Sequence, residues 1–401
     1  MSSELLDIDK AWDEFLEVLQ NATDALRTTA SDDPRTRAEA YDFLQGALAS
    51  AWIGIGHPDR NFPVIPEAYS EVMNLGSPCG DFVYQTLHIE PKGIYRIWGN
   101  RGSAAFVDMQ QVDSWFGENE HGTQSETLSN DSFDELAIDV AKDGSYEIIF
   151  SVDKPESGDW LPRNSRTRTL IIRIFILDWG IETPTTFNAE RLDCQEPTPG
   201  RRTLAESLKR IRQQTIFLRD LATTHSKFMD GLINDVGYNA VRRISFDKSS
   251  GHLDQIYWGM AMQIEPDEAL LLEWAVGEAE SVVFWGAVVN DSRWCVLDYR
   301  SCQSSLNNVQ AEVDNDGVFR AIVSSADPGI ANWLDTNDGE GKILMLRAKL
   351  CPGMPDPVVR RMTLKTAVSD LKERATPVLA DQRAASLRQR RIDYDHRYKG
   401  R

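Results

Sequence analysis

One block of sequence occurs twice in this chain, 173 residues apart. Residues 143–161 read DGSYEIIFSVDKPESGDWL, and residues 316–334 read DGVFRAIVSSADPGIANWL. Seven of the 19 positions are identical, whereas average residue usage gives roughly one identity by chance. We therefore interpret the chain as a duplicated module. What the two copies share is expected to be scaffold, and what differs between them is the better place to look for function.

Hydrophobic spacing divides the chain into helical and strand-rich parts. Residues 4–50 carry apolar side chains at helical spacing, with a break where Ser31 or Asp32 can cap a second helix. Short runs rich in Ile, Val, Phe and Tyr, separated by turn-forming residues, fill 82–192 and 268–364. The spacing becomes helical again between these two parts and at the C-terminal end.

This pattern predicts a mainly β protein with helical segments, of the α+β class. Two tandem β-sandwich modules, produced by the internal duplication, would be covered by N-terminal, central and C-terminal helices. We assign five segments: an N-terminal helical segment at 1–60, a first β-sandwich module at 61–200, central helices at 201–250, a second β-sandwich module at 251–364 and a C-terminal helical tail at 365–401.

Composition narrows the classes of partner and cofactor. The net charge of −19 repels phosphate backbones and anionic membrane surfaces, so we expect neither nucleic acid nor membrane as a partner. The five cysteines form no CxxC or Cys/His cluster, and no GxGxxG or Walker loop occurs, so we expect no metal and no cofactor. A signal peptide and a long apolar run are both missing from the sequence, which predicts a cytoplasmic protein. The sequence leaves open whether the protein forms a homo-oligomer.

The copies differ most after the arginine that follows each repeated block. The first copy continues into Asp178, Trp179 and Glu182, and the second copy has no counterpart of these residues. They lie where an apolar run gives way to a loop, a usual position for functional groups. Asp178 and Glu182 could divide acid and base roles in catalysis, with Trp179 contacting the ligand. The alternative is a turn-capping aspartate beside a surface glutamate.

Three further groups of residues are candidates. In the second copy, Asn332 and Asp335 could bind a ligand hydroxyl or a hard cation, or simply cap their loop; without a dense DxDxDG loop we predict no metal there. His57, in Gly-His-Pro-Asp, could be a base polarised by Asp59, or a loop histidine bonded to local backbone. Most of the 11 tryptophans are expected in the cores, with a few lining an apolar or sugar-binding cleft between the modules.

Several stretches resemble the bacterial and fungal family called domain of unknown function 1214. The resemblance covers roughly residues 50–400 and implies jelly-roll-like β-sandwiches with no settled activity. The family's Asn-Pro-Asp-x-x-Tyr block corresponds here to Cys79-Gly80-Asp81-Phe82-Val83-Tyr84, so Asp81 and Tyr84 are kept and become candidate ligand-binding residues. The matching stretches are GIYRIWGNRG at 93–102, the repeated block at 143–161, RIFILDWGIETP at 173–184, DPGIANWLDT at 327–336 and ASLRQRRIDYDHRY at 385–398.

Two functions from different classes fit these observations. The first is a cofactor-independent hydrolase or lyase, of glycosidase-like type, that acts on a small hydroxylated or aromatic compound by carboxylate acid/base chemistry. The alternative is a non-catalytic tandem β-sandwich protein that binds a carbohydrate or another small molecule. An enzyme requires at least two polar groups that converge in a cleft, with one strongly perturbed carboxylate.

Overall fold

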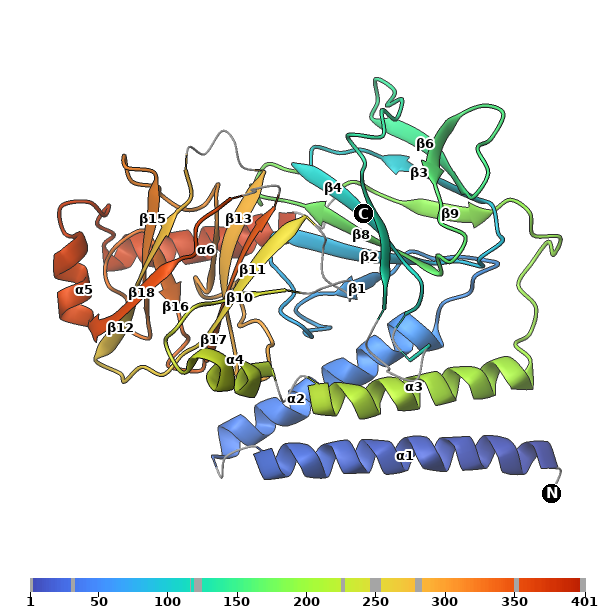
Figure 1. Cartoon of the computed structure of the whole chain (residues 1–401), viewed down its shortest axis with the longest axis horizontal. Coiled ribbons are helices and arrows are strands. Elements are labelled where there is room, and N and C mark those ends of the chain that lie inside the picture. The colour runs from blue at the N-terminus through green and yellow to red at the C-terminus, as the bar shows by residue number, and fades with distance from the viewer. Residues whose placement is uncertain are drawn as a thin grey trace.

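Two β modules stand side by side, and a group of helices packs below them (Figure 1). The computed structural model describes residues 3–29, 33–115, 117–118, 125–224, 228–245, 254–277, 283–349 and 353–396. Within these residues the first module contains β1 (Glu67–Tyr69), β2 (Phe82–His88), β3 (Tyr95–Asn100), β4 (Phe106–Val112), β5 (Thr127–Ser132), β6 (Ser145–Ser151), β7 (Asp159–Pro162), β8 (Thr169–Phe175) and β9 (Asn188–Arg191).

The second module repeats this set of strands in the same order. It contains β10 (Arg242–Ile244), β11 (Gln255–Ala261), β12 (Glu268–Ala275), β13 (Phe284–Asn290), β14 (Ser305–Asn307), β15 (Val318–Ser324), β16 (Trp333–Asp335), β17 (Ile343–Lys349) and β18 (Val358–Thr363). The first strand of this set, β10, lies inside the segment 201–250 that the sequence assigned to central helices.

Sheet topology confirms the duplication. The first module pairs a sheet of order β1-β2-β8-β4-β5 with one of order β7-β6-β3-β9. The second module pairs a sheet of order β10-β11-β17-β13-β14 with one of order β16-β15-β12-β18, which is the same order strand for strand. The predicted α+β class with two β-sandwich modules is therefore correct. Each strand in one module has a counterpart in the other, and equivalent strands can be compared.

The repeated block closes each sandwich in the same way. The indole Nε1 of Trp160 donates to the carbonyl oxygen of Ser151 at 3.2 Å, and Trp333 donates to the carbonyl oxygen of Ser324 at 3.1 Å. Each serine hydroxyl donates to the carbonyl oxygen two residues further on, at 2.6 and 2.8 Å. These hydroxyls are occupied by local backbone, as expected of scaffold residues.

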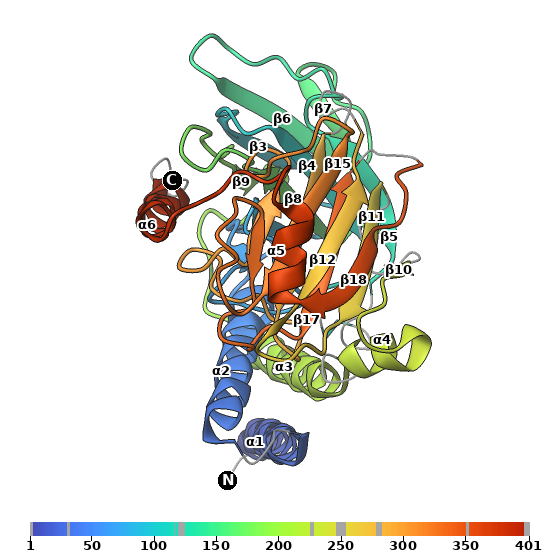
Figure 2. The same ribbon diagram turned by 90° about the vertical axis from the view of Figure 1, so that its left-hand side faces the viewer.

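Helices lie at one end of the pair of modules and beside the second module. They are α1 (Ser3–Thr29), α2 (Pro34–Ala51), the short π-helix η1 (Trp52–Gly56), α3 (Leu204–Thr224), α4 (Phe228–Val236), α5 (Leu364–Leu371) and α6 (Ala380–His396). In Figures 1 and 2, α1, α2 and α3 lie together beneath the modules, whereas α5 and α6 flank the second module. Phe15, Phe43 and Phe217 of the lower helices share one apolar cluster with Val112 and Ile171 of the first module.

The start of α2 differs from the prediction in one detail. The helix begins at Pro34, and its N-cap is Asp33, whose carboxylate accepts a hydrogen bond from the Thr36 backbone N–H at 2.8 Å. Our prediction of Ser31 or Asp32 as the cap was wrong, because the cap is the residue directly before the first helical residue. Ser31 and Asp32 themselves lie outside the described residues.

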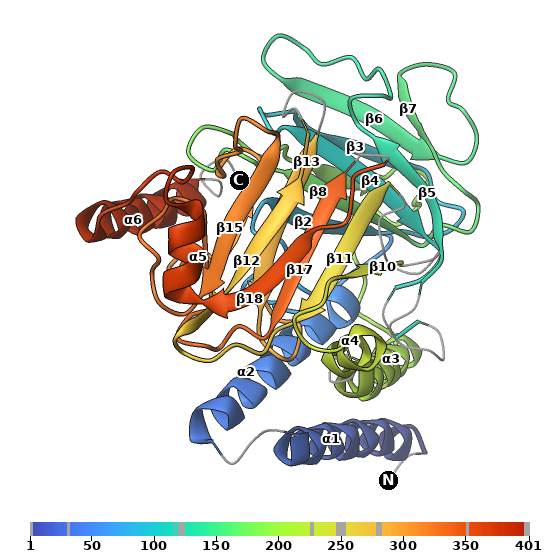
Figure 3. The same ribbon diagram turned by 60° about the vertical axis from the view of Figure 1, so that its left-hand side comes forward.

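The two five-stranded sheets face each other across the boundary between the modules. Figure 3 shows the sheet of β11, β17 and β13 in front of the sheet of β2, β8 and β4. Phe82 and Phe175 of the first module contact Phe284 of the second, with ring centroids 4.8 and 5.6 Å apart. Strands β8 and β17 are buried along their whole length for this reason, since one face of each packs in its own sandwich and the other against the neighbouring module.

Candidate functional site

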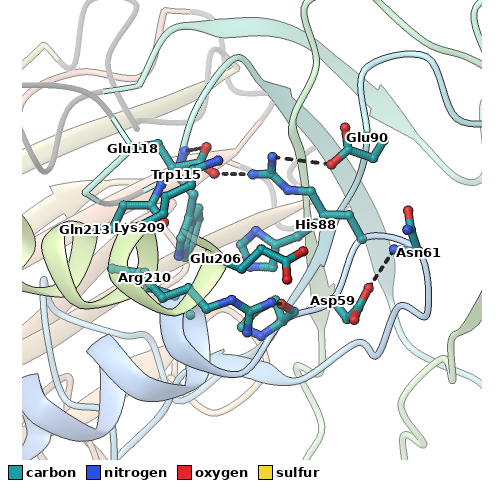
Figure 4. Close-up of a pocket in the computed structure, with 14 residues that line it drawn as sticks. Asp59, Asn61, His88, Glu90, Trp115, Glu118, Glu206, Lys209, Arg210 and Gln213 are labelled. Atoms are coloured by element: carbon teal, nitrogen blue, oxygen red, sulfur yellow. Dashed lines mark hydrogen bonds and ion pairs between the residues drawn. The ribbon is translucent and has the colours of Figure 1, made fainter. Parts of the chain in front are cut away.

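A cavity of about 160 Å³ lies between the first module and the helices, and we call it the His88 cavity (Figure 4). Three parts of the chain form its wall: the end of η1 with the loop that follows it, the ends of β2 and β4 with their loops, and α3. The lining residues are Gly54, Ile55, Pro58, Asp59, Arg60, Asn61, His88, Glu90, Trp115, Glu118, Glu206, Lys209, Arg210 and Gln213.

His88 is the buried polar group of this cavity. It is the last residue of β2, opposite Thr169 of β8, and only 4% of its surface is exposed. Its Nδ1 atom lies 3.1 Å from the Thr169 hydroxyl, and its Nε2 atom has no hydrogen-bond partner among the described residues. Burial, and to a smaller extent the charge of Arg60, lowers the pKa of His88 to about 3. The imidazole is therefore neutral at physiological pH and offers one free ring nitrogen.

Trp115 forms the aromatic wall beside this histidine. The two rings meet edge to face, with centroids 5.4 Å apart and planes at 77°. The indole can lie there because position 54 is glycine: a Cβ atom on Gly54 would be 2.7 Å from the Trp115 Nε1 atom. A glycine in the π-helix thus sets the position of the tryptophan in the cavity wall.

The carboxylates of the cavity are mostly occupied. Glu118 forms an ion pair with Arg60 and accepts the Trp115 backbone N–H at 2.9 Å. Asp59 accepts the backbone N–H of Asn61 at 2.8 Å, as a turn-forming aspartate does. Glu206 accepts the backbone N–H and the hydroxyl of Thr203 at 2.7 and 2.8 Å, which is the capping box of α3. Glu90 is 3.9 Å from the guanidinium of Arg60.

Free hydrogen-bond donors come mainly from α3. Lys209 and Gln213 line the cavity, and within the described chain their side chains have no hydrogen bond or ion pair. Arg210, between them, donates to the carbonyl oxygens of Gly56 and Pro58 at 2.6 and 2.7 Å, which fixes the helix to the loop. With its carboxylates engaged and these donors open, the cavity is suited to a ligand rich in hydrogen-bond acceptors.

The second module lacks the polar pair found at this site. Strand β11 corresponds to β2, and β17 corresponds to β8. The pair His88 and Thr169 in the first module is therefore replaced by Ala261 and Ile343, which face each other at the end of β11 and the start of β17. Both of these residues are buried in an apolar cluster. The histidine is not needed to build the sandwich, because the copy without it has the same topology.

Asp178 and Glu182 occupy one turn after β8 and do not line the His88 cavity. Asp178 accepts the backbone N–H of Gly180 at 3.1 Å. Glu182 is half-buried and accepts the backbone N–H groups of Leu177 and Ala105 at 2.9 and 3.3 Å. Burial raises the pKa of Glu182, against the lowering effect of these hydrogen bonds. Their catalytic role stays a prediction.

Trp179 and Asp81 lie in a buried network that joins the modules to α6. The Trp179 indole donates to Asp81 at 3.0 Å, and Asn307 of β14 donates to the same oxygen at 2.7 Å. Arg390 of α6 lies over the Trp179 ring, 4.3 Å from its centroid. Burial raises the pKa of Asp81. Trp179 and Asn307 both donate to Asp81, so the geometry favours a structural role for this part of the family's block.

The remaining candidates are separated from one another. Tyr84 is buried between the modules, where its hydroxyl accepts the Cys79 backbone N–H at 3.2 Å. Asn332 holds the backbone of Glu312 through bonds of 2.7 and 3.0 Å, and Asp335 accepts the Asn337 N–H at 2.7 Å.

The His57 ring is exposed and does not line the His88 cavity, although the residues that follow it do. Its backbone carbonyl accepts a hydrogen bond from Arg202 at 3.1 Å. Asp59, which we expected to polarise this histidine, instead bonds to the backbone of its own turn. The structure thus brings together His88 and Trp115, which the sequence did not select.

Comparison with known proteins supports the fold and one segment of the family resemblance. The model of the family described as protein of unknown function (DUF1214) matches residues 115–176. This match confirms the resemblance over a segment that contains the first copy of the repeated block. The other stretches quoted from the sequence lie wholly or mostly outside it. No curated protein matches the chain.

A solved structure shares the architecture of nearly the whole chain. The crystal structure of an uncharacterized protein from Burkholderia cenocepacia superposes with a TM-score of 0.81 at 24% identity, covering 91% of this chain and 100% of that one. At this identity the likeness shows the fold alone. The VPA0106 protein from Vibrio parahaemolyticus gives a TM-score of 0.44 at 11% identity, with coverage of 86% and 100%, and no argument rests on it. Among the described residues, the helices are too short or too polar to cross a membrane.

Proposed function

We propose that the protein, whose residues 115–176 match the model of the DUF1214 family, binds a small, polar, hydroxylated molecule in the His88 cavity. The matched segment supplies Trp115 and Glu118 to the cavity wall and Thr169 behind it. This proposal takes up the small-molecule-binding alternative from the sequence. The observation that carries it is the buried His88 imidazole, which lines the cavity and whose Nε2 atom has no hydrogen-bond partner among the described residues.

The size and chemistry of the cavity define the ligand class. A volume of about 160 Å³ is close to the roughly 150 Å³ of an engineered protein cavity that binds benzene. A small polyol, hydroxy acid or amide is a ligand of this size. Its acceptor atoms would bond to His88 Nε2, Lys209 and Gln213, and its apolar part would contact the ring of Trp115.

The acid–base properties of the site favour a binding function over a catalytic one. A general base works best when its pKa lies near the working pH, whereas the pKa of His88 is lowered to about 3. Glu118 is neutralised by Arg60, and Glu206 is held by the start of α3. These groups are suited to fixing a ligand in one orientation. A neutral imidazole can still donate one hydrogen bond to a carbonyl or hydroxyl oxygen.

The matched variants are His88→Ala and His57→Ala. His88→Ala reproduces the alanine found at the equivalent position of the second module, so the sandwich is expected to tolerate it. His57→Ala removes an exposed ring outside the cavity. Thermal-shift screening with small polyols, hydroxy acids and amides, followed by calorimetric titration, should find a ligand whose dissociation constant rises at least tenfold in His88→Ala. The same ligand should bind His57→Ala as it binds the unchanged protein. Equal affinity in all three proteins would contradict the proposal.

The second candidate is the cofactor-independent hydrolase or lyase expected from the sequence. It is favoured by one observation: Glu182 is half-buried close to Asp178, and burial raises its pKa, which is the direction expected of a general acid. Asp178→Asn and Glu182→Gln should each abolish turnover in a screen of aryl esters and aryl glycosides. Activity that is absent in the unchanged protein, or unaffected by both substitutions, would exclude this candidate. Homo-oligomerisation stays a prediction.

A further inference from the structure

The arginine that follows each repeated block occupies the same place in both modules. Arg173 is the fifth residue of β8, and Arg347 is the fifth residue of β17. Leu170, Ile172 and Ile174 of β8 belong to the core of the first module, so the alternation along the strand places Arg173 on the opposite face. The same alternation on β17 turns Arg347 away from the core of the second module. Both arginines therefore point toward the boundary where the two sheets meet.

This boundary is closed to bulk water around the two guanidinium groups. Arg173 and Arg347 are 8% and 5% exposed. Aromatic rings of both modules pack beside them, and Lys349 of the second module reaches across to Asp108 of the first, with Nζ and Oδ2 3.1 Å apart. The side chains of Lys349 and Asp108 are each 1% exposed. Charges placed here interact in a medium much less polar than water.

The cations of this boundary outnumber its carboxylates. Arg173, Arg347 and Lys349 carry three positive charges, and the one fully buried carboxylate among them, Asp108, is bonded to Lys349. Asp254 is also near Lys349, at 3.9 Å, but its side chain is 48% exposed. Two positive charges thus remain inside a chain whose net charge is −19.

Neither arginine has a carboxylate within ion-pair distance in the described part of the chain. Arg173 donates to the side-chain oxygen of Gln110 at 2.6 Å. Arg347 donates to the backbone carbonyl of Ser77, and its Nε atom has no hydrogen-bond partner among the described residues. Burying a charge without a counter-charge is costly, so natural proteins pair such groups or bring them to a ligand.

Comparison of the two modules shows why Arg347 has no carboxylate on a neighbouring strand. On one side, each arginine is paired across the sheet with a tyrosine, Tyr84 or Tyr257. On the other side, Arg173 is paired with Asp108, whereas the equivalent partner of Arg347 is Gly286. The copy that lacks the aspartate has no carboxylate of its own to offer.

The neighbouring tyrosine cannot neutralise the arginines. Burial raises the pKa of Tyr84 to about 12, even though both arginines act in the opposite direction. The phenol therefore stays protonated and neutral at physiological pH. The Tyr84 hydroxyl accepts the backbone N–H of Cys79 and also shares a side-chain hydrogen bond with Arg347, so the phenol lies directly beside that guanidinium.

We propose that the boundary between the modules is a binding site for a small organic anion, whose carboxylate or phosphate group is held by Arg173 and Arg347. A guanidinium presents its N–H groups in a planar fork that matches both kinds of oxyanion. An anion placed here would supply the negative charge that the boundary lacks. The site is independent of the His88 cavity, since it uses different residues on the boundary face of the sheets.

Calorimetric titration of the full-length protein tests this site. The probes are sodium phosphate and sodium acetate, each compared with sodium chloride at the same ionic strength, so that the two kinds of oxyanion are distinguished. At least one probe should bind saturably with one site per chain. Arg173→Met and Arg347→Met should each weaken this binding at least tenfold. Arg96→Met should leave it within twofold, because Arg96 is an arginine of β3 paired with Glu147 and Glu190 on the outer sheet.

Two further measurements separate loss of binding from loss of folding. Arg347→Lys keeps the charge but loses the planar fork, so its affinity should lie between those of the unchanged protein and Arg347→Met. In chloride alone, circular dichroism and the melting temperature of each methionine variant check that it is folded, since Arg173→Met also removes the bond to Gln110 and Arg347→Met removes the bond to Ser77. The proposal is overturned if neither oxyanion binds more tightly than chloride, or if both methionine variants bind it with unchanged affinity.

Discussion

The buried ion pair between Asp108 and Lys349 connects the two modules, and its removal has a magnitude that follows from the structure. The charged atoms are 3.1 Å apart and both side chains are 1% exposed. At an effective dielectric constant of about 20, two unit charges at this distance attract each other by about 5 kcal/mol. Removing one member of a buried pair typically costs about 3–5 kcal/mol, because the other charge is left without compensation.

The two members of the pair should respond unequally to substitution. Asp108→Asn leaves the cations of the boundary without their buried carboxylate, so we expect it to lower the free energy of unfolding by about 3–5 kcal/mol. Lys349→Met leaves Asp108 beside its strand neighbour Arg173, which can take over as a counter-charge, so the loss should be smaller by at least about 1 kcal/mol.

Urea unfolding followed by tryptophan fluorescence and by circular dichroism measures both losses. Two probes are needed because the modules can unfold separately. The double variant completes a double-mutant cycle and gives the coupling energy of the pair. This account of the charges at the boundary would be refuted if Asp108→Asn left the free energy of unfolding unchanged. It would also be refuted if Lys349→Met lowered that free energy as much as Asp108→Asn or more.

Three other predictions concern the His88 cavity and the repeated block. Between pH 6.5 and about 3 the unfolded chain binds a proton at His88 that the folded protein does not, so the free energy of unfolding should fall as the pH falls through this window. His88→Ala should remove up to roughly 5 kcal/mol of this loss. Urea unfolding at a series of pH values measures the difference. Trp333→Ala should cost about 3–5 kcal/mol in the same assay, and Trp160→Ala less, because Trp333 is 5% exposed and Trp160 is only half-buried. Gly54→Ala should weaken ligand binding at least tenfold in calorimetric titration, since its Cβ atom would displace the indole of Trp115.

The fold was largely predictable because its strongest signals are local. The repeated block and the long apolar runs marked the central strands of both sandwiches, for example β8 and β17. Short edge strands were missed because their side chains are polar or because they span three residues. Strand β5 reads TLSNDS, which is typical of a loop, and pairing with β4 makes it a strand. Such pairing is a long-range property that a local pattern does not contain.

The site was harder to predict because it combines distant segments. His88 ends the run FVYQTLH, in which a buried strand was the natural interpretation, and that interpretation is correct. Its neighbours Gly54, Trp115 and Lys209 come from separate parts of the chain and meet only in the folded protein. A signal was nevertheless present, since His88 and Thr169 are polar where the second copy has Ala261 and Ile343. Finding it required the strand register, because sequence similarity between the copies is concentrated in the repeated block.

The comparison of copies remains the most useful guide to function in this chain. Features present in both copies, such as the bonds from Trp160 and Trp333, close the sandwiches. We propose binding at features present in one copy only, such as the polar pair of His88 and Thr169. The duplicated arginines form a third case, because the two copies are brought face to face and leave their charges uncompensated.

The most direct test of the central claim is the nitrogen NMR spectrum of His88 in protein labelled with ¹⁵N-histidine. The account predicts a neutral imidazole at pH 6, because its pKa is lowered to about 3, and a change in the Nε2 resonance when a small hydroxylated ligand is added. The spectrum of His88→Ala assigns the signal, and His57 serves as the internal reference for an exposed ring. A His88 ring that is protonated at pH 6, or an Nε2 signal that no ligand of the panel shifts, would contradict the claim that this cavity is the binding site.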